Sequence, residues 1–154
     1  MTTIVYNPEE GVVAADSQDT DGSRKMQCDK LYYVNEHIIG TAGGSYAGLL
    51  FVRWFGEWED EPDYTDWEQH PDLVNLDLDE DFECLVVRPD GTCYMINRLF
   101  IPYEMKPGPV GVGSGSACAL GALMAGAHVK QAVKIACTID AHTSGPVKTM
   151  RVLG

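Results

Sequence analysis

Residues 1–5 read Met-Thr-Thr-Ile-Val, which places a hydroxyl residue second, directly ahead of an apolar, β-branched run. Such residues favour strands, so the run predicts a first strand that leads from the edge into the core. If Met1 is removed, Thr2 carries a nucleophile and a base on one residue: its hydroxyl can attack, and its free α-amine, which titrates near roughly 7.7–8.0, can accept the proton. Taken alone, a Thr-Thr pair after an initiator methionine more often has no catalytic role.

Length and composition predict one globular domain over residues 1–154, with 45% hydrophobic and 22% charged residues. No run approaches the ~18 apolar residues of a membrane span. The first residues lack a basic region followed by an apolar block, so no signal peptide is expected. The five cysteines are an odd number without CxxC spacing. They indicate reduced thiols in a cytoplasm. Since no membrane span is expected, we also predict no membrane partner.

The net charge of −12 is concentrated in one segment, because 13 of the 23 Asp and Glu residues lie between Glu57 and Glu83, where there is no Lys or Arg. This acidity argues against nucleic acid as a partner, since phosphates require a basic face. The segment is either a solvated loop or a docking strip for a basic partner. Its Asp77, Asp79 and Asp81 begin like a calcium-binding EF-hand loop, but Phe82 and Arg88 replace the required Gly and Glu. We therefore expect no calcium site there.

The order of elements predicts the fold class. Hydrophobic patterns and turn residues give strands, then a helix that Ser45 could cap, more strands, two helices and a last strand. This order suits an α+β, four-layer αββα sandwich, in which two antiparallel sheets lie between helix layers. Strands are expected at 3–7, 11–16, 30–34, 37–42, 82–87, 92–96, 110–112 and 147–153, and a loop or irregular strand at 17–29. Helices are expected after the Ser45 cap as far as Phe55, and at 117–127 and 129–140.

Six short motifs then occur in a particular order. They are Thr2–Val5, Ala15–Ser17, Asp29–Gly40, Ala42–Gly44, Gly113–Ser116 and Asp140–Thr143. Together they resemble the proteasome β-subunit and HslV group of threonine peptidases, which are N-terminal-nucleophile (Ntn) hydrolases. The resemblance covers residues 1–56 and 110–154 and implies the αββα sandwich of the Ntn type. It fails at residues 57–81, where Pro62, Pro71 and the acidic run predict that the family's second helix is shortened or replaced by a loop.

The resemblance implies a role for each matching residue. Thr2 would attack the peptide carbonyl, and the Lys30 ammonium would favour the proton-poor forms of the Thr2 amine and hydroxyl. Asp16 would hold the Lys30 charge in place. The backbone N–H of Gly43 would stabilise the oxyanion, although the Gly43-Gly44 pair could simply end a strand.

Further residues are expected around this centre. The resemblance implies that Ser114 forms hydrogen bonds near the Thr2 amine, with Asp140 and Thr143 as outer support, while Ser114 is equally plausible as a helix N-cap. We also expect Ser45, Tyr46 and Lys30 to line the pocket nearest Thr2.

A cation site is implied at the end of the last helix, where carbonyl groups lack amide partners. The resemblance assigns it to the backbone carbonyls of Cys137, Asp140 and Thr143, which would hold a structural Na⁺ or Mg²⁺. The chemistry itself requires no cofactor.

The resulting function hypothesis is a threonine-type endopeptidase that hydrolyses unfolded polypeptides. The resemblance implies a homo-oligomeric ring served by an ATP-dependent unfoldase of the AAA+ class. The alternatives are an Ntn hydrolase of small amides and a non-catalytic homologue. Retention of Thr2, Asp16 and Lys30 argues against the non-catalytic alternative. Catalysis requires removal of Met1, because a blocked Thr2 amine cannot act as the base.

Overall fold

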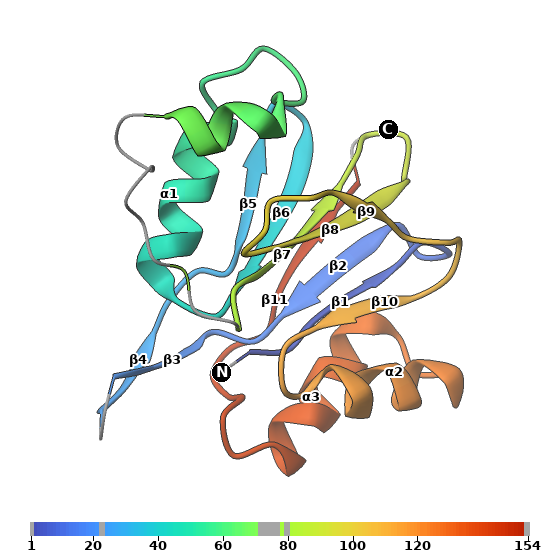
Figure 1. Ribbon diagram of the computed structural model, residues 1–154. Helices are drawn as coiled ribbons and strands as arrows, with labels where there is room; N and C mark the ends of the chain where they lie inside the picture. Colours follow the sequence, from blue (N-terminus) through green and yellow to red (C-terminus); the bar gives the residue numbers. More distant parts are fainter. Residues whose placement is uncertain (1, 22–23, 71–77, 79–80, 153–154) are drawn as a thin grey trace.

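The computed structural model describes residues 2–21, 24–70, 78 and 81–152, and Figure 1 shows their arrangement. The predicted strand over residues 147–153 and the EF-hand-like aspartates lie partly outside these residues. Within the described chain, no helix has the length and apolar character that a membrane span needs.

The first sheet contains the beginning of the chain as an inner strand. β1 (Ile4–Asn7) pairs with β2 (Val12–Ala15) on one side and with β10 (Val110–Val112) on the other, and β11 (Lys148–Arg151) pairs with β2. All these pairs are antiparallel. Because β1 has a partner on both sides, its register fixes the position of the residues that precede it.

The second sheet has five antiparallel strands in sequence order. They are β5 (Leu31–Val34), β6 (His37–Ala42), β7 (Glu83–Val87), β8 (Cys93–Asn97) and β9 (Tyr103–Glu104). The β5–β6 turn places Asn35 and Glu36 at positive φ, as a two-residue hairpin loop requires. The sequence did not predict the two-residue strand β9, because strands this short carry no periodic pattern.

Alternation along the strands divides the core into layers. Ile4 of β1 packs between the two sheets with Leu85 of β7, whereas Val5 faces the opposite side. There it contacts the layer formed by α2 (Ser116–Met124) and α3 (Val129–Ile139), while α1 (Ser45–Phe55) covers the outer face of the second sheet (Figure 1). The predicted αββα sandwich is thus confirmed.

Residues 17–29 are more regular than predicted. They form a separate two-stranded hairpin, in which β3 (Gln18–Asp21) pairs with β4 (Arg24–Gln27) and extends away from the sandwich (Figure 1). The sequence did not predict these strands because their residues are mostly polar. The hairpin builds no hydrophobic core, so neither of its faces has to be apolar.

The acidic segment carries a short helical turn, where the sequence resemblance implied a shortened second helix or a loop. The 3₁₀ helix η1 (Tyr64–Gln69) buries Trp67, which stacks on Phe100 with a ring-centroid distance of 3.9 Å. Aromatic packing therefore anchors this part of the segment to α1 and the second sheet. Much of the remainder of the acidic segment lies outside the described residues.

The predicted cap of α1 is wrong by one residue. Gly44 is the N-cap residue and Ser45 is the first residue of the helix. Gly43 and Gly44 have φ values of +89° and +139°, so the bend between β6 and α1 is completed by two glycines in conformations that other residues rarely adopt.

Substitutions on the buried side of α1, which packs on the aromatic cluster, should lower stability much more than substitutions on its exposed side. Phe51 is fully buried and contacts the rings of Trp54, Trp67 and Phe100. We expect Phe51→Ala to lower the free energy of unfolding by about 3–5 kcal/mol, because it removes these contacts and leaves a cavity. Tyr46→Ala on the exposed side of the same helix should cost less than ~0.5 kcal/mol. Urea unfolding of both variants measures the difference, and equal losses would contradict the assigned orientation of α1.

Candidate active site

The site is centred on Thr2, which lies two residues before β1 and is buried. The Lys30 ammonium, on the residue directly before β5, donates to Thr2 Oγ1 over 3.2 Å. Thr2 leads into the first sheet and Lys30 into the second, so the site lies where the two sheets meet. The structure thus brings together two of the residues that the sequence proposed.

Asp16 holds the lysine in position. Its carboxylate lies 2.9 Å from Lys30 Nζ, and the Asp16 and Lys30 side chains are 0% and 6% exposed. The carboxylate also accepts the backbone N–H groups of Thr3 at 2.9 Å, Gln18 at 3.2 Å and Ser144 at 3.3 Å. These hydrogen bonds offset the cost of burying the charge and fix the direction of the ion pair.

A second polar network reaches the site from the end of α3. Thr143 Oγ1 donates to Asp140 Oδ2 over 3.0 Å, and Ser114 Oγ donates to the same oxygen over 2.5 Å. Because the Thr143 proton is used in this way, the 2.9 Å contact between Thr3 and Thr143 must have the Thr3 hydroxyl as donor. Thr3 therefore connects the beginning of the chain to the segment after α3.

Asp140 is held in its charged form by this network. Partial burial opposes ionisation, but hydrogen bonds from Ser114, the His142 N–H and Thr143 outweigh it, so the pKa of Asp140 is lower than its ordinary value. Ser114 is not the N-cap of α2, since Gly115 occupies that position. Its hydroxyl bonds to Asp140, so its predicted contact with the Thr2 amine stays a prediction.

Two glycines, Gly113 and Gly115, for which the sequence predicted no role, leave the space that the start of the chain occupies. Gly113 has φ +93°, and a Cβ at this position would lie 2.0 Å from the Thr2 carbonyl oxygen. A Cβ on Gly115 would lie 1.9 Å from Thr3 Oγ1, and the Gly115 N–H donates to the Thr2 carbonyl over 3.3 Å. The Gly-Ser-Gly pattern was the available sequence signal, and its glycines serve close packing against the start of the chain.

Gly43 lines the same two pockets as Thr2, and its position has a structural requirement of its own. A Cβ there would lie 2.2 Å from the Asp81 carbonyl oxygen, and φ is +89°. Approach of the Asp81 backbone is therefore sufficient to require glycine. The oxyanion role of Gly43 remains a prediction.

Two adjoining pockets meet at Thr2. The first, of about 490 Å³, lies on the Lys30 side, and the second, of about 400 Å³, lies on the Ser114 side. Both are lined by Thr2, Ala42, Gly43 and Asp81. A groove thus continues on both sides of the candidate nucleophile.

The lining of the first pocket corrects one prediction. Lys30 lines it as expected, but α1 contributes Leu49, while the Tyr46 side chain is 86% exposed. Because the helix begins after Gly44, residue 49 lies on the side of the helix that faces the pocket. The side chain of Ser45 is outside the described set.

The predicted cation ligands lie at the end of α3. Cys137 is in its last turn, and Asp140 and Thr143 follow it. The Asp140 carbonyl accepts the Thr143 N–H over 3.2 Å, which leaves one of its two lone pairs available. Among the described side chains, no group of three His, Cys, Asp or Glu residues is arranged to hold a metal. A carbonyl-based site is compatible with this arrangement and remains a prediction.

The architecture has close structural counterparts. The chain superposes on BPH from Thiobacillus denitrificans in complex with epoxomicin with a TM-score of 0.76 and 20% identity, covering 98% of this chain and 99% of that chain. It superposes on HslV from Trypanosoma brucei with a TM-score of 0.69 and 22% identity, covering 97% and 99%. The chain has an HslV-like fold. A second BPH structure gives a TM-score of 0.71 at 20% identity over 98% of this chain and 97% of that one.

The sequence matches no protein-family model and no curated protein. At this level of identity the structural likeness establishes the HslV-like fold alone. It confirms the fold that the six motifs implied. Activity has to be argued from the residues at the site.

The packing of Gly113 against Thr2 gives a prediction with a matched control. Gly113→Ala and Gly126→Ala both introduce a side chain at positive φ, but a Cβ at Gly126 meets nothing within 4 Å. Both should lose about 1–2 kcal/mol of stability from backbone strain. Gly113→Ala should lose a further ~1–3 kcal/mol because the methyl group collides with the Thr2 carbonyl. Urea unfolding compares the two variants, and equal losses would show that Thr2 is not packed on Gly113.

The lowered pKa of Asp140 predicts a dependence of stability on pH. Its stabilising effect is complete above the unfolded-state pKa, about 3.9 for Asp, and is lost as the pH falls through the lower folded-state pKa. Between pH 5 and pH 3 the wild type should therefore lose more stability than Asp140→Asn. Urea unfolding at the two pH values tests this, and parallel losses would exclude a contribution from Asp140.

Proposed function

We propose that this protein is an N-terminal threonine hydrolase that cleaves peptide bonds once Met1 has been removed. The observation that carries the proposal is the buried contact of Thr2 Oγ1 with a lysine that is itself paired to Asp16. A hydroxyl, an ammonium and a carboxylate are thereby aligned at the position where an N-terminal amine would be released.

In the proposed mechanism, the free α-amine of Thr2 accepts the hydroxyl proton, directly or through a water. Oγ1 attacks the carbonyl carbon of the substrate, and the released amine leaves with a proton as the ester with Thr2 forms. Water then hydrolyses this ester and regenerates Thr2. The Lys30 ammonium at 3.2 Å favours the proton-poor hydroxyl and the uncharged amine, and Asp16 keeps the ammonium in place.

The remaining charge develops on the carbonyl oxygen of the substrate. We assign its stabilisation to the backbone N–H of Gly43, which lies beside Thr2 on the wall of both pockets. Ser114, Asp140 and Thr143 act as support, because their network fixes Thr3, the residue next to the nucleophile.

The groove favours a polypeptide over a small amide as substrate. Cavities of about 490 and 400 Å³ flank Thr2, so residues on both sides of the cleaved bond can be accommodated. A small amide would need only one of them. This arrangement supports an endopeptidase.

Assembly is part of the same proposal. The HslV-like fold and the family resemblance support a homo-oligomeric ring, with the active sites facing a chamber and an AAA+ ATPase delivering unfolded chains. Such sequestration would protect other proteins in a cytoplasm. We also retain a structural Na⁺ or Mg²⁺ on the carbonyls of Cys137, Asp140 and Thr143, where it would stabilise the turn after α3.

Thr2 variants test the proposal. Thr2→Ala should lower peptide hydrolysis by at least ~10³-fold, because no other group replaces the nucleophile. Thr2→Ser, which keeps the hydroxyl and the amine, should retain measurable activity. Turnover of fluorogenic peptides by protein with confirmed loss of Met1 provides the measurement, and unfolding curves confirm that each variant is folded.

Several outcomes would contradict the mechanism. Full activity of Thr2→Ala, or of protein that retains Met1, would exclude the amine–hydroxyl pair. Binding of epoxomicin, the compound named in the BPH complex, gives a second readout. We expect it to raise the melting temperature of processed wild type and to leave Thr2→Ala unchanged. Cleavage of small amides with no cleavage of peptides would favour the small-amide alternative.

A further inference from the structure

The pocket on the Lys30 side of Thr2 is lined by an excess of acidic groups. Among the described residues that line it, three are acidic, Asp19, Asp29 and Asp81, and one is basic, Lys30. The Lys30 charge is already paired with Asp16 at 2.9 Å. The described residues that line this pocket therefore carry a net negative formal charge.

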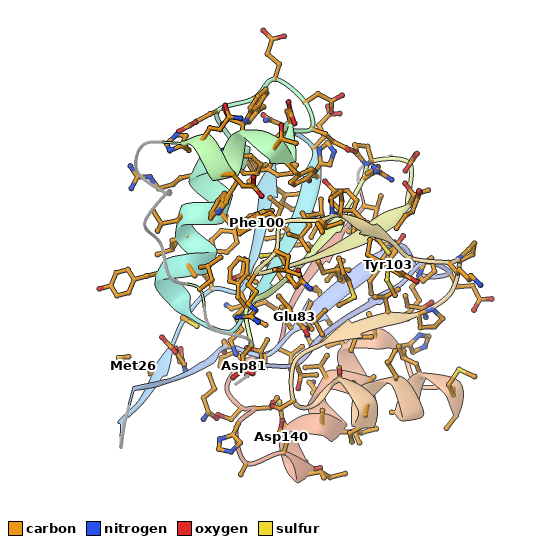
Figure 2. The ribbon with its side chains drawn as sticks, viewed as in Figure 1. Met26, Asp81, Glu83, Phe100, Tyr103 and Asp140 are labelled. Carbon is orange, nitrogen blue, oxygen red and sulfur yellow. The ribbon has the colours of Figure 1, made fainter. Side chains whose placement is uncertain are left out.

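The second pocket is also lined by acidic residues. It is lined by Asp81 and also by Glu83, the first residue of β7. Figure 2 shows Asp81 and Glu83 at the end of the second sheet nearest the beginning of the chain. Acidic groups thus lie on both sides of the candidate nucleophile, and Asp81 is common to the two pockets.

The walls of the first pocket also include apolar surface from Tyr32, Ala42 and Leu49. A lysine or arginine side chain matches such a pocket, because its aliphatic stem packs on apolar walls while its charged end reaches carboxylates. The Cys28 thiol adds no charge, since burial raises its pKa.

We propose that the first pocket selects a lysine or arginine side chain on the residue whose carbonyl Thr2 attacks. This inference rests on the proposed peptidase function and specifies its substrate class. An acidic side chain would be repelled by these residues, and a purely apolar one would gain nothing from the charges of Asp29 and Asp81.

The test compares peptides that differ only at the residue before the cleaved bond. Processed wild type should cleave an Arg peptide with kcat/KM at least ~10-fold above that for a Leu peptide, and a Glu peptide should be the poorest. The preference should fall as salt is raised, because Asp29 and Asp81 are exposed and their charges are screened.

A double substitution tests whether Asp29 and Asp81 cause the preference for Arg. Asp29→Asn combined with Asp81→Asn should reduce the Arg preference, measured as the ratio of kcat/KM for the Arg and Leu peptides, to within ~3-fold of unity. Both side chains are exposed, so the changes leave the core intact. Glu59→Gln removes one exposed negative charge that lies outside both pocket linings, and it should leave the preference unchanged.

The outcomes separate this inference from the function on which it rests. Cleavage of the Leu peptide in preference to the Arg peptide, or an Arg preference that survives the double substitution, overturns the specificity and leaves the peptidase proposal intact. Absence of Thr2-dependent cleavage for every peptide overturns the peptidase proposal itself.

Discussion

The buried ion pair between Asp16 and Lys30 is the constraint on which the site depends. Each charge would be costly to bury alone, yet the two side chains are 0% and 6% exposed and 2.9 Å apart. Backbone N–H groups of Thr3, Gln18 and Ser144 converge on the same carboxylate. The pair therefore joins the first sheet, the β3 hairpin and the turn before β11, and the ammonium also donates toward Thr2.

The alternation of side chains along β1 then determines the surroundings of Thr2 and Thr3. Ile4 faces the space between the sheets and Val5 faces α2 and α3, so consecutive residues at the beginning of the chain have opposite surroundings. Thr2 follows the first direction and meets Lys30, while Thr3 follows the second and meets Thr143. The Thr2 hydroxyl is thereby placed beside Lys30, and the Thr3 hydroxyl fixes the backbone next to it.

Sequence reasoning succeeded where local patterns or motifs carried the information. Most strands and the helices of the sandwich follow from hydrophobic periodicity, and the motif resemblance named Thr2, Asp16 and Lys30, which the structure brings into contact. It failed at the β3–β4 hairpin, whose polar residues show no apolar face, and at the role of Thr3, which depends on contacts across 140 positions. Such long-range hydrogen bonds leave no trace in spacing along the chain.

The contacts that position Thr2 do not use its nitrogen. Lys30 donates to Oγ1, and the Gly115 N–H donates to the Thr2 carbonyl. These contacts are made by the hydroxyl and the carbonyl of Thr2, and neither group changes when the preceding residue is cleaved. Removal of Met1 would therefore add a base to a site whose other groups are in place. The fold would organise the nucleophile first, and processing would supply the proton acceptor without any rearrangement of the sheets.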